Sequence, residues 1–191
     1  MKLYLIRHGA TRANLEHLYC GSSDLPLAPE GVAALAGLRY EAPEARYLTS
    51  GMRRANETME LLFPGRAYET DPRFREVDFG VFELKSYDQL KDDPAYLRWI
   101  TGDNEKNVPP GGESGEAFRV RVLAALETIR VDTVLVTHGG VIAAIMEARF
   151  PEAGKNRYQW QPRPGHGFVV TSDSWQPIPT DNACKEREEM L

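Results

Sequence analysis

The segment Tyr4–Asn14 reads YLIRHGATRAN and places an arginine and a histidine directly after an apolar run. Leu3–Ile6 are continuously apolar, which is typical of a short strand buried on both faces of a parallel sheet. Such a strand delivers Arg7 and His8 to the point where it ends. Ligands of open parallel sheets bind beyond the carboxyl ends of the strands, so these two side chains mark a candidate site.

Segments typical of strands and helices alternate along the rest of the chain. Strands are predicted at Leu3–Ile6, Tyr47–Thr49, Val131–Thr137 and Gly167–Thr171. Helices are predicted at Pro29–Tyr40, Arg53–Phe63, Tyr87–Ile100 with a break at Pro94, Ser114–Arg130, and after His138-Gly139-Gly140 as far as Arg149. The alternation predicts a three-layer α/β/α fold, in which a mostly parallel sheet carries helices on both faces. We expect residues 1–191 to form a single domain whose tail, from about residue 181, is flexible.

The composition is that of an ordinary globular protein, with 42% hydrophobic and 27% charged residues. A formal net charge of −5 argues against nucleic-acid and anionic-membrane partners, which select basic surfaces. Cys20 and Cys184 lie too far apart in sequence to indicate a disulfide framework or a metal knuckle. The N-terminal apolar run is too short for a signal peptide or a membrane span. These features predict a cytoplasmic enzyme or binding domain.

Basic side chains follow three of the predicted strands. Arg7 and His8 follow the first, Arg53 and Arg54 open the helix after the second, and His138 follows the third. Each residue has an ordinary structural alternative, such as a hydrogen-bonded loop histidine or a solvated arginine pair. The coincidence at three strand ends favours a site for a small, multiply charged oxyanion such as phosphate, to which guanidinium groups bind in a bidentate manner.

The ordered motifs in which these residues lie resemble those of the histidine phosphatase superfamily, which includes cofactor-dependent phosphoglycerate mutases and small-molecule phosphatases. The matching pieces are Leu5-Ile6-Arg7-His8-Gly9 with Thr11 and Asn14, Ser50-Gly51-Met52-Arg53-Arg54-Ala55 with Thr58, Phe74-Arg75-Glu76-Val77-Asp78-Phe79-Gly80 with Glu83, Pro110-Gly111-Gly112-Glu113-Ser114 with Arg121, and Val136-Thr137-His138-Gly139-Gly140.

The resemblance implies that His8 is a nucleophile that forms a covalent phosphohistidine. It implies that Glu76 is the proton donor and then the base. Glu76 and Asp78 are two residues apart and would point the same way in an extended segment, so Asp78 is the second candidate for the acid. Contacts to the phosphoryl group are implied for Arg7, Arg54 and His138, and supporting contacts to the substrate for Asn14, Gly139 and Thr11.

The function that this resemblance implies is hydrolysis of a small phosphomonoester without a metal ion or cofactor. The segment Leu18–Leu27 resembles the phosphatase branch that includes α-ribazole phosphatases. Phosphoglycerate mutase-type transfer and a non-catalytic phosphate-binding module are the alternatives, and a homodimer is a candidate assembly. A metallohydrolase with His8, His138, Glu76 and Asp78 as ligands is disfavoured, because the closely spaced ligand pairs of zinc motifs are missing.

The sequence departs from the family pattern at three positions. Ala28 stands where a threonine often precedes the helix that begins near Pro29, and Ala10 replaces a frequent acidic residue. Leu84 stands where a glycine often follows the position of Glu83. These differences leave the implied mechanism intact and bear on substrate preference.

Overall fold

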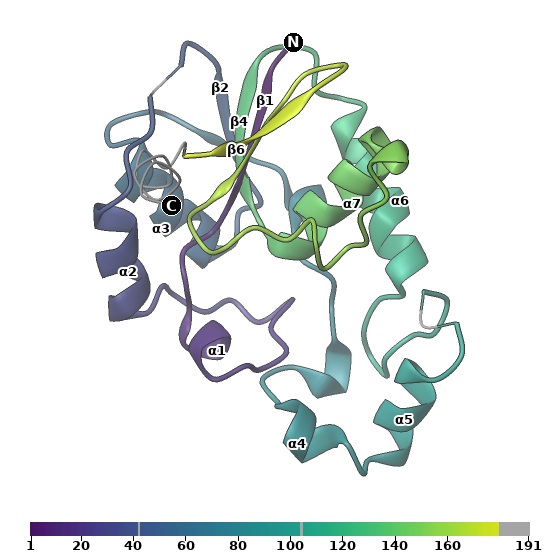
Figure 1. Ribbon diagram of the computed structural model, residues 1–191. Coiled ribbons are helices and arrows are strands. Elements are labelled where there is room, and N and C mark those ends of the chain that lie inside the picture. Colours follow the sequence, from purple (N-terminus) through teal and green to yellow (C-terminus); the bar gives the residue numbers. More distant parts are fainter. Residues whose placement is uncertain (42, 104, 180–191) are drawn as a thin grey trace, which may run out of the picture.

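The computed structural model describes residues 1–41, 43–103 and 105–179, and its centre is a six-stranded sheet with the order β3-β2-β4-β1-β5-β6 (Figure 1). Strands β1 to β4 pair in parallel, whereas β5 and β6 are antiparallel and lie at one edge. The strands are β1 (Leu3–Arg7), β2 (Arg46–Thr49), β3 (Glu69–Thr70), β4 (Thr133–Thr137), β5 (Gly167–Val170) and β6 (Trp175–Ile178). The prediction of a mostly parallel sheet is confirmed.

Helices cover both faces of this sheet. In Figure 1, α2 and α3 lie on one side of the strands, and α6 and α7 lie on the other. The helices are α1 (Arg12–Leu15), α2 (Pro29–Ala36), α3 (Arg53–Leu62), α4 (Tyr87–Leu90), α5 (Pro94–Ile100), α6 (Gly115–Leu126) and α7 (Gly139–Arg149), with 3₁₀ turns at Pro72–Phe74, Gly80–Phe82 and Pro151–Ala153. The predicted three-layer α/β/α architecture is therefore confirmed.

Strand β4 shows why both faces need a helical layer. All five of its residues are buried, and successive side chains point to opposite faces. Val134 and Val136 pack in a core with Ala55 and Met59 of α3, whereas Leu135 belongs to the core that α6 and α7 close. Burial of each such aliphatic side chain stabilises the fold by about 1.5–3 kcal/mol, so a polar residue on either face would be costly.

The strand register brings the candidate residues to one edge. Arg7 at the end of β1 pairs with Thr137 at the end of β4, so His8 and His138 leave the sheet side by side. Thr49 of β2 pairs with Val136, which places Ser50 at the same edge. The sequence prediction that these strand ends converge is confirmed by the pairing.

Several elements are shorter than predicted. Helix α2 ends at Ala36 instead of Tyr40, and α6 ends at Leu126 because the next turn tightens, with the Thr128 amide donating to the Ala125 carbonyl at 3.0 Å. Strand β4 begins at Thr133, since Val131 is 56% exposed. The tail predicted from residue 181 lies outside the described residues.

Helices α4 and α5 lie below the sheet edge (Figure 1), and they contribute to a third, smaller hydrophobic cluster. Phe82, Leu90 and Tyr96 are buried there, and Phe79 and Trp99 pack against them. The Tyr19 hydroxyl lies 2.6 Å from the Tyr96 hydroxyl, and this contact connects the loop after α1 to α5. The partly buried aromatic side chains of the cluster are Tyr19, Phe79 and Trp99. This cluster forms one wall of the cavity described below.

No helix among the described residues is both long and apolar enough to cross a membrane.

Candidate active site

Two buried histidines meet at the sheet edge. The ring centroids of His8 and His138 are 5.1 Å apart, and the two side chains are 5% and 0% exposed. The Nδ1 atom of His8 lies 2.7 Å from the Gly9 carbonyl oxygen. A carbonyl can only accept a hydrogen bond, so a neutral His8 carries its proton on Nδ1 and keeps the lone pair of Nε2 free.

Both imidazoles are held neutral by their surroundings. Burial lowers the pKa of His8 well below its ordinary value, and the charges of Arg54 and Arg7 lower it further. Burial and the Arg54 guanidinium likewise lower the pKa of His138. The Nε2 atom of His138 lies 2.8 Å from the Ser50 hydroxyl, while its Nδ1 is buried and has no hydrogen-bond partner among residues 1–41, 43–103 and 105–179. A neutral His8 with a free Nε2 has the protonation state that a nucleophile requires.

Two arginines lie beside these histidines. Arg54 is 1% exposed and donates from Nη1 to the Ser23 carbonyl at 2.7 Å and from Nη2 to the Gly21 carbonyl at 2.8 Å. Arg7 donates to the Pro162 carbonyl at 2.9 Å. The Nε atoms of both arginines are buried and have no hydrogen-bond partner in the described part of the chain. Neutral carbonyls do not compensate a guanidinium charge, and the single carboxylate Glu76 acts on Arg7, so a net positive charge remains and the unpaired donors suit an incoming anion.

Glu76 is the carboxylate at this edge. Its Oε2 accepts from the Gly140 amide at 2.9 Å in the first turn of α7, and its Oε1 accepts from the Val77 amide at 3.1 Å. A Cβ atom on Gly140 would lie 2.3 Å from Oε1, so only glycine allows the carboxylate to lie there. Asp78 does not point the same way, contrary to our prediction. It accepts instead from the Ser22 hydroxyl and from a backbone amide, each at 2.8 Å.

The residues predicted to assist have different positions. Asn14 lines the cavity, and its Oδ1 accepts from the backbone amide and the hydroxyl of Thr11 at 2.9 and 3.0 Å. Thr11 is 1% exposed and caps α1, so it acts on the cavity only through Asn14. Gly139 approaches Arg7 so closely that a Cβ atom would lie 3.2 Å from the guanidinium carbon.

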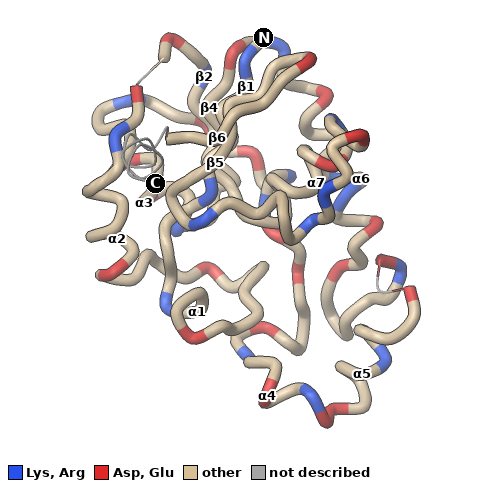
Figure 2. Tube along the Cα trace, viewed as in Figure 1, with Lys and Arg blue, Asp and Glu red and all other residues tan. Residues whose placement is uncertain are grey.

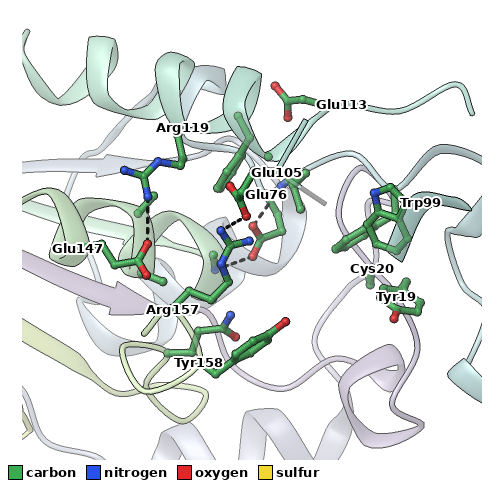
Figure 3. A pocket seen from close by; sticks show the side chains of 18 of the residues that line it. Tyr19, Cys20, Glu76, Trp99, Glu105, Glu113, Arg119, Glu147, Arg157 and Tyr158 are labelled. Atoms are coloured by element: carbon green, nitrogen blue, oxygen red, sulfur yellow. Dashed lines mark hydrogen bonds and ion pairs between the residues drawn. The ribbon is translucent and has the colours of Figure 1, made fainter. Parts of the chain in front are cut away.

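Beside Glu76 lies a cavity of about 370 Å³ (Figure 3). Tyr19, Cys20 and Trp99 line one side, and Glu105, Arg119, Glu147, Arg157 and Tyr158 line the other. Arg7 and Asn14 are also part of the wall. A volume of this size accommodates a small metabolite. Within the described residues, no group of three or more His, Cys, Asp or Glu side chains could hold a metal ion.

Glu83 has a role in the site that the sequence did not predict. Its carboxylate accepts from the amides of Gly21 at 2.9 Å, Ser22 at 2.9 Å and Ser23 at 3.2 Å, and also from the Phe79 amide at 3.1 Å. Two of these residues, Gly21 and Ser23, provide the carbonyls that hold Arg54. Glu83 therefore positions Arg54 through the loop 21–23. The position of Glu83 after the Glu76 motif was visible in the sequence, but the loop 21–23 that it binds lies about sixty residues away.

Thr58 is a second residue whose role the sequence left open. Its hydroxyl donates to the Arg54 carbonyl at 2.7 Å and accepts from the Gly9 amide at 2.9 Å. The side chain thus joins α3 to the backbone that follows His8. The helix carrying one arginine and the loop carrying the histidine are held in register by this bond.

The fold and this site define an α/β protein in which two neutral imidazoles and two arginines meet at the sheet edge, next to a cavity that Arg7 and Glu76 line. The family model for the histidine phosphatase superfamily (branch 1) matches residues 3–171, and the chain belongs to this superfamily. The adenosylcobalamin/alpha-ribazole phosphatase of Salmonella typhimurium is 32% identical over 158 residues, which cover 76% of this chain and 78% of the relative. The corresponding Escherichia coli protein is 30% identical over 158 residues, with coverages of 76% and 77%.

A solved structure supports the same assignment. The crystal structure of a phosphoglycerate mutase from Thermus thermophilus superposes with a TM-score of 0.74 at 35% identity and covers 91% of this chain and 94% of that one. The matched chains are thus named both as phosphatases and as a mutase. The resemblance predicted from the sequence motifs is confirmed at the level of the family.

Replacement of Glu83 by glutamine is expected to weaken inhibition by vanadate, an analogue of the transferring phosphoryl group, by about tenfold. The amide group has one acceptor oxygen in place of a charged carboxylate, and charge-assisted hydrogen bonds contribute about 1.5–3 kcal/mol each. The inhibition constant and the melting temperature would be measured together. Glu57→Gln is the matched control, because Glu57 accepts from the Leu27 amide at 2.8 Å and supports no carbonyl bound to Arg54. An unchanged inhibition constant in Glu83→Gln would contradict the positioning role.

Proposed function

We propose that this protein hydrolyses a small phosphomonoester through a covalent phosphohistidine on His8. The observation that carries the proposal is the free Nε2 of a neutral, buried His8 beside two arginines whose hydrogen bonds, among the described residues, go to backbone carbonyls. Such a pocket neutralises a phosphoryl dianion while it leaves the nucleophile unprotonated. Membership of the histidine phosphatase superfamily supports the same chemistry.

In the first step, the Nε2 lone pair forms a bond to phosphorus as the bond from phosphorus to the leaving oxygen breaks. Arg7, Arg54 and His138 contact the phosphoryl oxygens, and the carboxylic acid of Glu76 gives its proton to the leaving alkoxide. The hydrogen bond from the Gly140 amide fixes the Glu76 carboxyl group at the N-terminus of α7. Proton donation at this point removes the charge that would otherwise develop on the alcohol.

In the second step, a water molecule attacks phosphorus and gives a proton to the Glu76 carboxylate. The bond between phosphorus and nitrogen breaks, and its electron pair returns to Nε2 of His8. The products are the alcohol and inorganic phosphate, and both side chains recover their starting protonation states. Asn14 and the backbone of Gly139 are supporting donors in this scheme. Thr11 contributes by orienting Asn14.

We further propose that the protein is cytoplasmic. Its substrate is a free metabolite and not a nucleic acid. These proposals rest on the net charge of −5 and on the absence of a cysteine framework in the sequence. We also propose that residues 1–191 form a single domain, and a homodimer remains the candidate assembly.

Phosphoryl transfer to a second alcohol is the alternative function. It is supported by the similar Thermus thermophilus structure, which is named a phosphoglycerate mutase. A single-turnover experiment separates the two. The protein is mixed with labelled substrate, quenched for phosphohistidine, and then given unlabelled 3-phosphoglycerate. We expect the label to appear as inorganic phosphate at the same rate with and without this acceptor. Transfer of the label to 3-phosphoglycerate, without release of phosphate, would establish the mutase reaction.

A further inference from the structure

The outer part of the cavity contains two arginines, and each is paired with a carboxylate. Arg119 of α6 donates to Glu147 of α7 at 3.1 Å. Arg157, in the segment between α7 and β5, pairs with Glu105 in the loop before α6. Figure 3 shows both pairs on the same side of the cavity, facing Tyr19 and Trp99 across it. All four charged side chains line the cavity wall, and each is between 22% and 39% exposed.

The arginines beside the two histidines are arranged differently. Arg7 lines the cavity, whereas Arg54 is not among the residues that line it and lies next to His8 and His138. Within the described residues, the hydrogen bonds of Arg7 and Arg54 go to backbone carbonyls, and neither arginine forms an ion pair. Two arginines and one carboxylate, Glu76, which interacts electrostatically with Arg7, therefore leave a net positive charge beside the histidines, whereas the charge of the outer part is locally balanced. Figure 2 shows the same mixture of basic and acidic positions along the trace near α6 and α7.

Glu105 is held in place by the helix that follows it. Its carbonyl accepts from the Glu116 amide at 2.9 Å, and a Cβ atom on Gly115 would lie 2.7 Å from its Oε2. The carboxylate thus packs against the first turn of α6, where the partial positive charge of the helix N-terminus favours it. A carboxylate held in this way is a fixed feature of the cavity wall.

Balanced charge at the outer end has a consequence for the substrate. A leaving group with its own carboxylate or phosphate would have to displace Glu105 or Glu147 from its arginine, or lie beside an unbalanced negative charge. Like charges brought together in a partly buried site are unfavourable and weakly screened. A neutral alcohol meets no such penalty, and the opposite wall offers it aromatic surface from Tyr19 and Trp99.

We infer that the cavity selects phosphomonoesters of uncharged alcohols, and that Glu105 and Glu147 are specificity-determining residues that reject a second anionic group. This inference rests on the proposed hydrolysis of a phosphomonoester. It assigns the phosphoryl group to the histidines and arginines at the sheet edge, and the alcohol to the charge-balanced outer part of the adjoining cavity.

The test compares kcat/KM for glycerol 3-phosphate and 3-phosphoglycerate. Glycerol 3-phosphate carries a hydroxymethyl group where 3-phosphoglycerate carries a carboxylate. We expect the wild-type protein to prefer glycerol 3-phosphate by roughly tenfold or more. Glu105→Gln leaves Arg157 unpaired, so the ratio should shift toward 3-phosphoglycerate by roughly three- to tenfold. The double variant Glu105→Gln/Arg157→Gln should lose this gain. Glu116→Gln removes one charge from α6 outside the cavity and is the matched control.

The outcomes are distinct. Equal kcat/KM values for the two esters in the wild-type protein, or a ratio that Glu105→Gln does not move, would overturn the charge selection and leave hydrolysis standing. Loss of protein structure would lower the rates on both esters and not their ratio. Failure of the wild-type protein to hydrolyse either ester or 4-nitrophenyl phosphate would remove the proposed function, and this inference with it.

Discussion

Turnover is expected to fall by about 10⁴–10⁶-fold when His8 is replaced by asparagine, which is the scale of loss when a covalent nucleophile is removed. Asparagine is polar and similar in length, but its amide has no lone pair basic enough to attack phosphorus. The measurements are kcat on 4-nitrophenyl phosphate and the amount of acid-labile label retained by the protein after a quench. Both should be lost together.

The matched control is His17→Asn. His17 is exposed, lies outside the cavity and has a φ of +54°, a backbone conformation that asparagine tolerates. This variant should keep both the turnover and the label. Turnover that survives in His8→Asn would refute the covalent mechanism. A wild-type protein that binds vanadate but never acquires label would instead identify a phosphate-binding module.

The pKa of His8 explains why this nucleophile needs no neighbouring base. Protonation would remove the lone pair, so activity is lost as pH falls through the pKa of the imidazole. Burial places that pKa well below the ordinary value of 6.5, and the nucleophile is therefore neutral throughout the physiological range. The structure makes burial the larger cause and the charge of Arg54 the next.

The central strands and the converging strand ends could be predicted because their signals are local. Continuous apolar runs such as Leu3–Ile6 reveal buried parallel strands, and the residue after each run is then placed by the topology of the sheet. Strand β6 gave no such signal, since it lies at the sheet edge and its residues are at most partly buried. The break between α4 and α5 was visible at Pro94, because proline begins a helix more readily than it continues one.

The parts of the site that could not be predicted depend on contacts between distant segments. Glu83 receives amides from the loop 21–23, and Arg157 meets Glu105 about fifty residues away in sequence. Neither contact follows from periodicity or from a motif. The backbone conformation of Leu84 could not be predicted from the sequence either. This residue adopts a φ of +58°, which costs a non-glycine residue about 1–2 kcal/mol, while its amide donates to the Tyr19 carbonyl at 2.7 Å.

Glu76→Gln is expected to slow hydrolysis of glycerol 3-phosphate by about 10²–10⁴-fold, the usual contribution of a general acid. Glutamine preserves the acceptor for the Gly140 amide but has no proton to give. The loss should be much smaller on 4-nitrophenyl phosphate, because nitrophenolate is a weak base and leaves without a proton. The measurement is therefore kcat on both esters, and the decisive quantity is the difference between the two losses.

Asp78→Asn is the matched control for this difference. It removes the same charge two residues away, from a side chain that bonds the Ser22 hydroxyl and does not line the cavity. If Asp78 only holds the loop, its variant should affect both esters by the same factor. If Glu76→Gln also lowered both equally, its carboxylate would contribute by charge or position and not by proton donation. A leaving-group dependence confined to Asp78→Asn would make Asp78 the acid, against the geometry that places Glu76 on the cavity wall and Asp78 behind it.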